Sequence, residues 1–208
     1  MENVLSKTFY YPASEAGKEA LYLTSELTDA RLSKMTITCL SSLRNLGVNV
    51  LKVTVSPKLV KRKVVFSELQ MMAVKLAFEW LIKRHPNWGE FYVVGVSVAC
   101  CAAMDVILRR PEVVRYMLIS PPIGHNDFTL LTKLRTEGRI VLGSSDRLIG
   151  KAVIKRFAIA SFRGNRIGNV GMVVVRQANH FLSEEANQLG AVITKTFGPW
   201  RAGLSYVQ

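Results

Sequence analysis

The residues FYVVGVSVACCAAMDVILRRP, numbers 91–111, carry the strongest structural signal in the chain. The first six, FYVVGV, are apolar and rich in β-branched side chains, which is typical of a buried strand. Residues 99–110 have a helical pattern and stop at Pro111, which cannot continue a helix. Strand and helix meet at GVSVA, residues 95–99. Ser97 is therefore expected on a very tight turn that lifts its hydroxyl clear of the backbone.

On both sides of this segment, short apolar runs alternate with longer segments of helical period. This alternation predicts βαβ units and a mainly parallel sheet with helices on both faces. No repeat, low-complexity block or linker divides the chain, so we expect a single domain over residues 1–208 with its core at about 19–197. Strands are expected at residues 3–11, 19–25, 48–55, 91–96, 113–119, 139–142 and 170–176. Helices are expected at residues 30–46, 67–84, 99–110, 128–134, 148–162 and 183–197.

Composition is that of an ordinary globular protein, with 49% apolar and 21% charged residues in a chain of 208. No apolar run has the roughly 18 residues needed to span a bilayer, and the first residues lack the apolar segment of a secretory signal. A cytoplasmic protein without a membrane span is therefore expected. The three cysteines form no CxxC or Cys/His cluster, so neither a metal site nor another cofactor is expected.

The formal net charge of +13 is the least ordinary feature of the composition. Clustered Lys and Arg attract phosphates, so a nucleic acid or a membrane surface is a conceivable partner. The charges are spread along the chain, however, and the densest run is KLVKRK, residues 58–63, in an expected loop after Pro57. No zinc finger, basic zipper or aromatic RNA-binding signature accompanies them. A generally basic, solvated surface is favoured over dedicated nucleic-acid binding, which the charge leaves open.

Ser97 has two interpretations. A serine at the start of a helix is usually an N-cap. On so tight a turn it can instead be a nucleophile, provided that a base accepts its proton and a carboxylate orients the base. The small residues Gly95 and Ala99 would keep strand and helix from colliding. Free N–H groups at the helix start would also favour developing negative charge at this point.

The candidates for the base are three histidines. His85 lies between Arg84 and Pro86 and is expected to cap a helix end, whereas His125 lies in a loop and can line a pocket. His180 follows the last expected strand directly, in QANHF. Among the three, His180 alone is expected on a short loop at the carboxyl end of a late strand.

The aspartates are sorted in the same way. Asp29 and Asp127 are expected at helix starts and Asp105 in mid-helix, whereas Asp146 follows the strand RIVL through GSS. The carboxyl ends of parallel strands share one edge, so Asp146 and His180 should converge with the serine there. The order Ser, Asp, His is that of α/β-hydrolases. Asp146 as a helix cap and His180 as a polar loop residue remain the alternative.

The ordered segments FYVVGVSVA, YMLISPP, IVLGSSD and VVRQANHF resemble the nucleophile elbow, the next strand, the acid loop and the histidine loop of the α/β-hydrolase superfamily. The resemblance covers about residues 19–197 and is greatest to small capless serine hydrolases related to dienelactone hydrolases. It implies an α/β-hydrolase sandwich without a large cap. It also implies that Ser97 is the nucleophile, His180 the general base and Asp146 its orienting acid. The backbone N–H of Val98 would be one half of the oxyanion hole.

Two positions depart from the family pattern. Ala99 replaces the second glycine of the usual elbow, a change small enough to keep the turn. The loop after the first long strand reads TSELT, residues 24–28, where related hydrolases often have a His/Gly-rich segment. The backbone N–H of Ser25 or Glu26 is the candidate for the second oxyanion donor, since the hole needs no particular side chain.

These residues predict a metal-independent serine hydrolase that cleaves a small ester or thioester through an acyl-enzyme. The same geometry would serve an acyltransferase. The alternative is a catalytically weak or inactive binding protein with an α/β-hydrolase fold and a basic surface. The glycine-free loop at residues 24–28 and the net charge both favour this alternative. A dinucleotide-binding protein is disfavoured because no GxGxxG follows the first strand.

Overall fold

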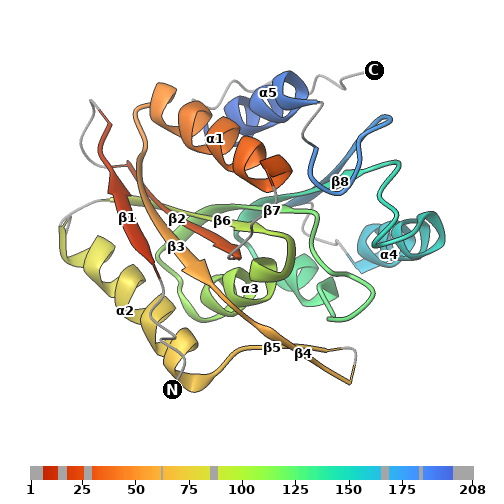
Figure 1. Ribbon diagram of the computed structural model, residues 1–208, viewed down its shortest axis with the longest axis horizontal. Coiled ribbons are helices and arrows are strands. Elements are labelled where there is room, and N and C mark those ends of the chain that lie inside the picture. The colour runs from red at the N-terminus through yellow and green to blue at the C-terminus, as the bar shows by residue number, and fades with distance from the viewer. Residues whose placement is uncertain are drawn as a thin grey trace.

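A seven-stranded sheet forms the centre of the computed structural model, which describes residues 7–13, 18–25, 30–61, 63–84, 89–164, 169–182 and 185–198 (Figure 1). The strand order is β1-β3-β2-β6-β7-β8-β9. Only β1 at the edge runs antiparallel to its neighbour in this sheet, so the predicted, mainly parallel sheet is confirmed. The strands are β1 (Thr8–Tyr11), β2 (Lys18–Ser25), β3 (Asn49–Val55), β6 (Glu90–Val96), β7 (Val113–Ile119), β8 (Glu137–Gly143) and β9 (Val170–Val175).

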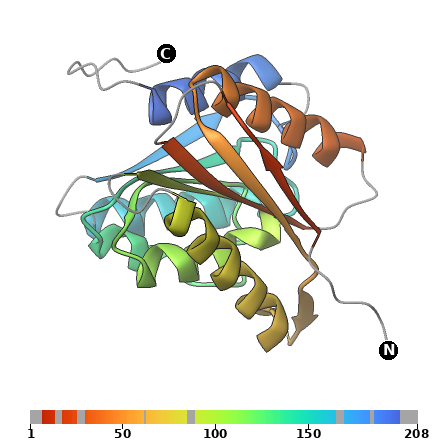
Figure 2. The same ribbon diagram turned by 90° about the vertical axis from the view of Figure 1, so that its left-hand side faces the viewer.

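Helices cover both faces of this sheet, as Figure 2 shows from the side. One face packs against α1 and α5, and the other packs against α2, α3 and α4. Consecutive residues of β6 alternate between these two apolar cores, with Val93 in one and Val94 in the other. A strand buried on both faces needs apolar residues at every position, which explains the uninterrupted run FYVVGV. The helices are α1 (Ala30–Asn45), α2 (Glu68–Arg84), α3 (Cys100–Arg109), α4 (Lys151–Gly164) and α5 (Ala186–Phe197), with short 3₁₀ helices η1 (Ser97–Ala99) and η2 (Thr129–Lys133).

The start of α2 shows how local sequence sets a boundary. The Ser67 hydroxyl accepts a hydrogen bond from the Gln70 backbone N–H, and the Gln70 side chain accepts one from the Ser67 N–H. This reciprocal pair is a capping box, which satisfies two backbone donors that the first turn leaves unpaired. Gln70 also donates to the carbonyl oxygen of Ser56, which ties the helix start to the end of β3.

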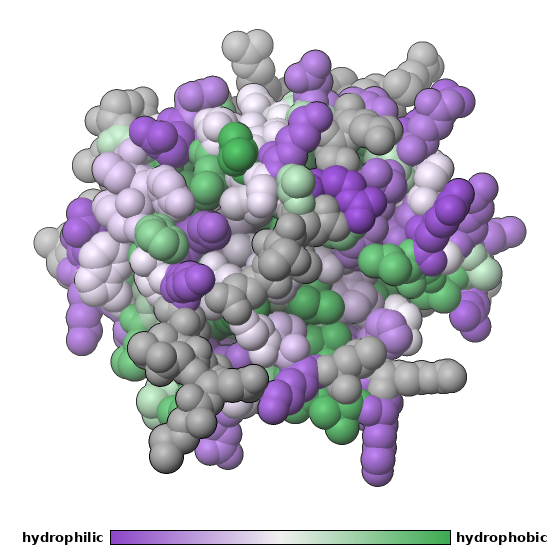
Figure 3. Space-filling view, in the orientation of Figure 1, coloured by the Kyte–Doolittle hydropathy of each residue, from purple (hydrophilic) through white to green (hydrophobic). Residues whose placement is uncertain are grey.

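The segment after Pro57, expected as a loop, is instead a β-hairpin. The strands β4 (Lys58–Val60) and β5 (Lys63–Val65) pair antiparallel, and Lys61 in the turn has a φ of 46°. Strands of three residues that contain lysine are too short to show the alternation of apolar and polar residues that predicts a strand. The surface in Figure 3 shows hydrophobic and hydrophilic side chains next to one another along the lower edge, where Figure 1 places this hairpin.

Helix α4 begins three residues later than expected from the pattern. The Asp146 carboxylate accepts hydrogen bonds from the backbone N–H groups of Leu148 and Ile149, and these bonds hold a turn before the helix. Gly150 follows with a φ of +79°, a conformation that suits glycine and does not continue a helix. In the part of the chain that the structure describes, no helix is both long and apolar enough to cross a membrane.

Candidate active site

Ser97 lies at the junction of β6 with η1 and α3, and its backbone has a φ of 51°. A non-glycine residue with positive φ is uncommon, and such strain is typical of functional turns. The close approach of strand and helix requires Gly95, since an added Cβ atom would lie 2.6 Å from the Cβ of Ala103. Ala99 is completely buried in the same turn. The backbone thus has the geometry expected of a nucleophile elbow.

Three side chains from distant parts of the chain meet at this carboxyl edge of the sheet. The Ser97 Oγ lies 2.8 Å from Nε2 of His180, and Nδ1 of His180 lies 2.7 Å from Oδ2 of Asp146. Asp146 follows β8 and His180 follows β9, so parallel strands bring both residues to the end of the sheet where β6 presents the serine. Both the histidine and the aspartate are buried.

The environment of Asp146 favours its charged form. Burial raises the pKa of this carboxyl, but the hydrogen bond to His180, the attraction of that ring and two backbone N–H donors together lower the pKa below its ordinary value. The donors are the N–H groups of Leu148 and Ile149, at 2.8 and 3.1 Å from Oδ1. With one oxygen held by the backbone, the other is fixed toward the imidazole.

Ser120 is a site residue that the sequence reasoning missed. It is completely buried with a φ of 50°, and its hydroxyl donates a 2.6 Å hydrogen bond to the backbone carbonyl of His180. Its own N–H donates to the carbonyl of Val141, which locks it between β7 and β8. The available signal was a serine at the carboxyl end of a buried strand, directly before two prolines. From the sequence alone, SPP indicates only the end of the strand expected at residues 113–119.

Gly143, the last residue of β8, allows the histidine loop to approach. A Cβ atom there would lie 2.3 and 2.4 Å from the carbonyl oxygens of Ala178 and Asn179. The loop is tied to the adjacent acid loop as well, because the N–H of Ser145 donates to the carbonyl of Ala178. His180 is therefore positioned through its main chain from two sides.

The other candidate acids and bases lie elsewhere or outside the described residues. Asp105 forms a 2.7 Å ion pair with Arg109 on the surface of α3. Asp127 accepts hydrogen bonds from the N–H and hydroxyl of Thr129, at the start of η2. His125 is exposed in the turn that follows the two prolines. Asp29 and His85 fall outside the described residues.

Of the three residues predicted to provide oxyanion donors, the structure describes Val98 and Ser25. Val98 lies in the first turn of η1, where backbone N–H groups have no partner within the helix. The register of β2 with β6 pairs Leu23 with Gly95, which puts Ser25 level with the serine one strand away, at about 4.8 Å spacing. Glu26 lies outside the described residues.

A shallow groove of about 310 Å³ begins at Ser25 and runs along the α1 face of the sheet toward β1. Apolar and hydroxyl-bearing side chains line it together. Its walls include Thr24 and Ser25 of β2, Leu32 and Ile37 of α1, and Phe9 of β1.

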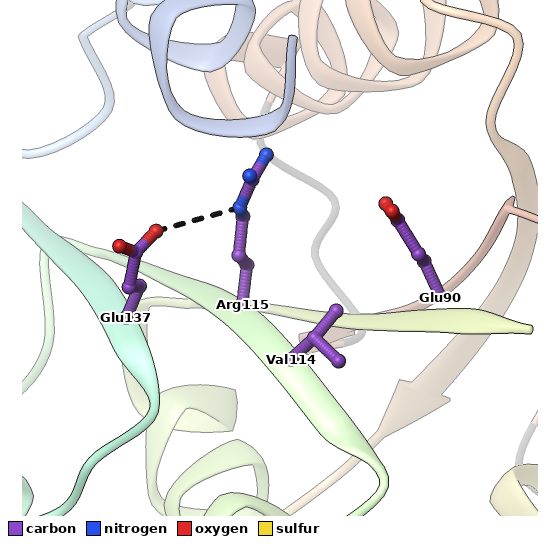
Figure 4. Close-up of a pocket in the computed structure, with 4 residues that line it drawn as sticks. All are labelled: Glu90, Val114, Arg115 and Glu137. Atoms are coloured by element: carbon purple, nitrogen blue, oxygen red, sulfur yellow. Dashed lines mark ion pairs between the residues drawn. The ribbon is translucent and has the colours of Figure 1, made fainter. Parts of the chain in front are cut away.

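A second hollow, of about 420 Å³, lies at the opposite, amino edge of the sheet, between Glu90, Val114, Arg115 and Glu137 (Figure 4). Arg115 forms a 3.5 Å ion pair with Glu137 and donates to the carbonyl oxygens of Thr196 and Gly198 at the end of α5. The seven residues of β6 separate this hollow from Ser97 by roughly 20 Å. The guanidinium of Arg115 is therefore occupied by its bonds to Glu137 and to the end of α5.

The three cysteines are not candidates for a nucleophile. Cys39, Cys100 and Cys101 are all buried free thiols. Burial raises the pKa of Cys39 and of Cys101 to about 12, and burial also raises the pKa of Cys100 well above its ordinary value. Thiols of this kind are inert. Among the described residues, no three His, Cys, Asp or Glu side chains gather in a way that could hold a metal ion.

No family model matches the chain. An uncharacterized protein of Rickettsia prowazekii (strain Madrid E) is 26% identical over 126 residues, which cover 56% of this chain and 50% of that protein. The chain thus spans about half the length of the curated relative it matches.

Several solved structures are similar to this chain over nearly its whole length. A protein of unknown function from Agrobacterium tumefaciens, proposed to be an α/β hydrolase, superposes with a TM-score of 0.70 at 16% identity and covers 91% of this chain and 90% of its own. The esterase Pf2001 of Pyrococcus furiosus gives a TM-score of 0.65 at 16% identity, with 94% of both chains covered. A lidless α/β serine hydrolase from Xanthomonas campestris gives 0.63 at 13% identity, covering 91% and 92%.

These likenesses show the fold. The chain has the α/β-hydrolase fold, as predicted from the four ordered segments. Residues 97–146, all of which the structure describes, contain α3, β7, η2 and β8 but no inserted cap, which agrees with the lidless neighbour.

Proposed function

We propose that this protein is a serine hydrolase that cleaves small esters or thioesters through an acyl-enzyme. The observation that carries the proposal is the continuous chain of hydrogen bonds from Ser97 through His180 to Asp146. Nucleophile, base and orienting carboxylate are each within direct hydrogen-bond reach of the next group, which is the geometric requirement for activating a hydroxyl.

In the acylation step, Ser97 Oγ attacks the substrate carbonyl carbon while His180 Nε2 accepts the hydroxyl proton. The carboxylate of Asp146 stabilises the imidazolium that results and holds its ring in place. The tetrahedral intermediate then breaks the bond to the alcohol or thiol, which leaves with the proton from Nε2. Water attacks the acyl-serine by the same route, releasing the acid and restoring Ser97.

The oxyanion of each tetrahedral intermediate needs donors already in position. The N–H of Val98 is the first donor, since it belongs to the helix start that follows the nucleophile. The N–H of Ser25 or Glu26 is the second, supported by the position of the β2 end beside η1. Loss of a donor of this kind costs about 10²–10³ in rate, so this pair sets the efficiency of the enzyme.

The substrate should be small or slender at the acyl group. Without an inserted cap between Ser97 and Asp146, little protein surrounds a bound ester above the serine. The groove of about 310 Å³ that starts at Ser25 offers room for one narrow arm. The esterase from Pyrococcus furiosus and the lidless serine hydrolase from Xanthomonas campestris support the same reaction class on the same fold.

Labelling with a fluorophosphonate probe tests the proposal directly, because such probes react with serines that a neighbouring base has activated. Wild type should label rapidly, whereas Ser97→Ala and His180→Ala should not. Ser41→Ala, at an exposed serine of α1, is the matched control and should label like wild type. Absence of labelling in folded wild type would contradict the proposal and favour the non-catalytic binding protein.

A further inference from the structure

We propose that the solvent face of α2 and the adjoining hairpin β4–β5 together dock onto an anionic phospholipid surface. The inference concerns a surface that the proposed hydrolase chemistry does not use. It rests on exposed apolar side chains in a helical row, on the lysines beside them, and on the place of both in the fold.

Helix α2 has a row of apolar side chains on the side that faces solvent, in addition to the apolar side that faces the core. Leu69, Met72, Leu76 and Trp80 have spacings of three and four residues, so they form one row along the helix. They are 68%, 58%, 60% and 41% exposed. The opposite side of the helix buries Val74, Phe78 and Leu81. Exposed apolar side chains gathered in one row and bordered by charged ones are typical of an interaction surface.

Lysines surround this row. Lys75 and Lys83 are exposed on α2, and Lys58, Lys61 and Lys63 are exposed on the hairpin. Residues 58–84 contain seven Lys or Arg and two Glu, a net charge of +5. One of the two acids, Glu79, is already paired with Arg110. Exposed valines, Val60 and Val65, continue the apolar surface onto the hairpin.

A bilayer with anionic headgroups matches both components of this surface. The leucine and methionine side chains can enter the boundary between headgroups and acyl chains, while lysines reach lipid phosphates. Trp80 packs edge-on against Tyr10, with a centroid distance of 5.3 Å, and Arg84 lies over both rings. An amphipathic ring next to cations is typical of a membrane interface.

Two other occupants fit less well. A second copy bound through the same face would bring the lysines of both copies together, and that like-charge contact is unfavourable. A nucleic acid would satisfy the lysines but leave the row of Leu69, Met72 and Leu76 without an apolar partner, because nucleic-acid recognition by this kind of surface relies on phosphate contacts.

The hairpin also links this surface to the proposed active site. It follows β3 directly, and β3 ends at the same carboxyl edge of the sheet as β6, with β2 between them. Figure 1 shows the hairpin at the lower edge beside the first turns of α2, and Figure 3 shows hydrophobic atoms there among hydrophilic ones. Docking through this surface would hold the carboxyl edge close to the bilayer.

Vesicle co-sedimentation tests the inference with the full chain. Wild type should bind vesicles of phosphatidylcholine with phosphatidylglycerol and should not bind vesicles of phosphatidylcholine alone. Binding should weaken as salt is raised, because the Debye length falls from about 10 Å at 0.1 M to about 3 Å at 1 M. Failure of wild type to bind the anionic vesicles at low salt would overturn the inference.

Matched variants separate this surface from the general charge of the protein. Met72→Ser/Leu76→Ser and Lys61→Glu/Lys63→Glu should each reduce vesicle affinity about tenfold or more. The controls Leu130→Ser/Ile159→Ser and Lys34→Glu/Lys155→Glu change exposed residues elsewhere and should have little effect. Equal losses in test and control pairs would overturn the inference. A dimer in gel filtration that Met72→Ser/Leu76→Ser disrupts would overturn it in favour of self-association.

This test is independent of the hydrolase proposal. Fluorophosphonate labelling does not involve vesicles, and vesicle binding does not need Ser97. The variant Ser97→Ala should therefore bind anionic vesicles like wild type. Loss of vesicle binding in this variant, with its fold intact, would contradict docking through α2 and the hairpin.

Discussion

The two edges of the parallel sheet both contain charged groups, but they use them differently. At the amino edge, Arg115 is paired with Glu137 and with the carbonyl oxygens that end α5. At the carboxyl edge, backbone N–H groups hold Asp146, and the Ser120 hydroxyl holds the carbonyl of His180. The side chains of Asp146 and His180 are hydrogen-bonded to each other, and His180 is hydrogen-bonded to the hydroxyl of Ser97.

This difference distinguishes the candidate site from a structural ion pair. A hollow lies at the amino edge as well as at the carboxyl edge, so a cavity alone does not identify the candidate site. The carboxyl edge is distinguished by positive φ at Ser97 and Ser120, and at Gln177 and Leu182 on either side of His180. It also contains a buried acid with a lowered pKa, Asp146. Strain and a shifted pKa at one place are typical of function.

The largest effect should come from removing the nucleophile or the base. Ser97→Ala or His180→Ala should lower kcat for a small ester by about 10⁶, to the level left by binding and the oxyanion donors. Hydrolysis of a p-nitrophenyl ester and unfolding by urea would be measured together. A Ser97→Ala protein that keeps its fold and more than a tenth of its activity would show that Ser97 is not the nucleophile.

A smaller loss is expected at the acid. Asp146→Asn should keep the shape of the loop but lower kcat by about 10⁴, because an amide neither stabilises the imidazolium nor fixes its tautomer. Steady-state kinetics on the same ester would separate kcat from KM, which should change little. Unaltered kcat would mean that Asp146 serves only as the cap of the turn before α4.

Ser120 should have an intermediate effect through the position of His180. Ser120→Gly tolerates the positive φ but removes the hydroxyl that holds the His180 carbonyl, so kcat should fall on the order of 10 to 100-fold with little change in KM. The rate of fluorophosphonate labelling should fall in parallel. A variant that loses stability but labels at the wild-type rate would give Ser120 a purely structural role.

Lowering the pH should remove the contribution that Asp146 makes to the stability of the folded protein. The pKa of this carboxyl is lowered in the folded state, so the unfolded chain takes up the proton at higher pH than the native one. The stability it contributes is present above the unfolded pKa and is lost as pH falls through the folded value. The difference in unfolding free energy between wild type and Asp146→Asn should therefore shrink between pH 6 and pH 3 in urea titrations. A difference that grows on acidification would contradict the lowered pKa.

The features of the fold and of the candidate site that could be predicted from the sequence are those with a local pattern. Apolar runs on both faces of the sheet, the glycine before Ser97 and the positions of Asp146 and His180 after strands are visible in the order of residues. The fold predicted from them is confirmed. The catalytic roles of the three residues stay predictions.

The rest depends on contacts between distant residues. The hydrogen bond from Ser120 to the carbonyl of His180 joins residues 60 positions apart. Because its acceptor is a main-chain oxygen, which every residue has, the bond cannot be predicted from the residue types. The hairpin β4–β5 was missed because three-residue strands rich in lysine show no alternation. Arg115 was missed for a similar reason, since its partners at the end of α5 are backbone carbonyls.

The smallest effect on activity should come from the amino edge. Arg115→Met removes the ion pair to Glu137 and the bonds to the last turn of α5 but leaves the carboxyl edge untouched. It should lower the free energy of unfolding by about 1–2 kcal/mol, the cost typical of losing hydrogen bonds to a charged group. Labelling of Ser97 should stay within about twofold of wild type, because roughly 20 Å separates the two edges. Urea unfolding and probe labelling of the same preparation measure both quantities. A labelling rate that falls as far as in Ser120→Gly would mean that α5 transmits the change to the histidine loop, and that the two edges do not act independently.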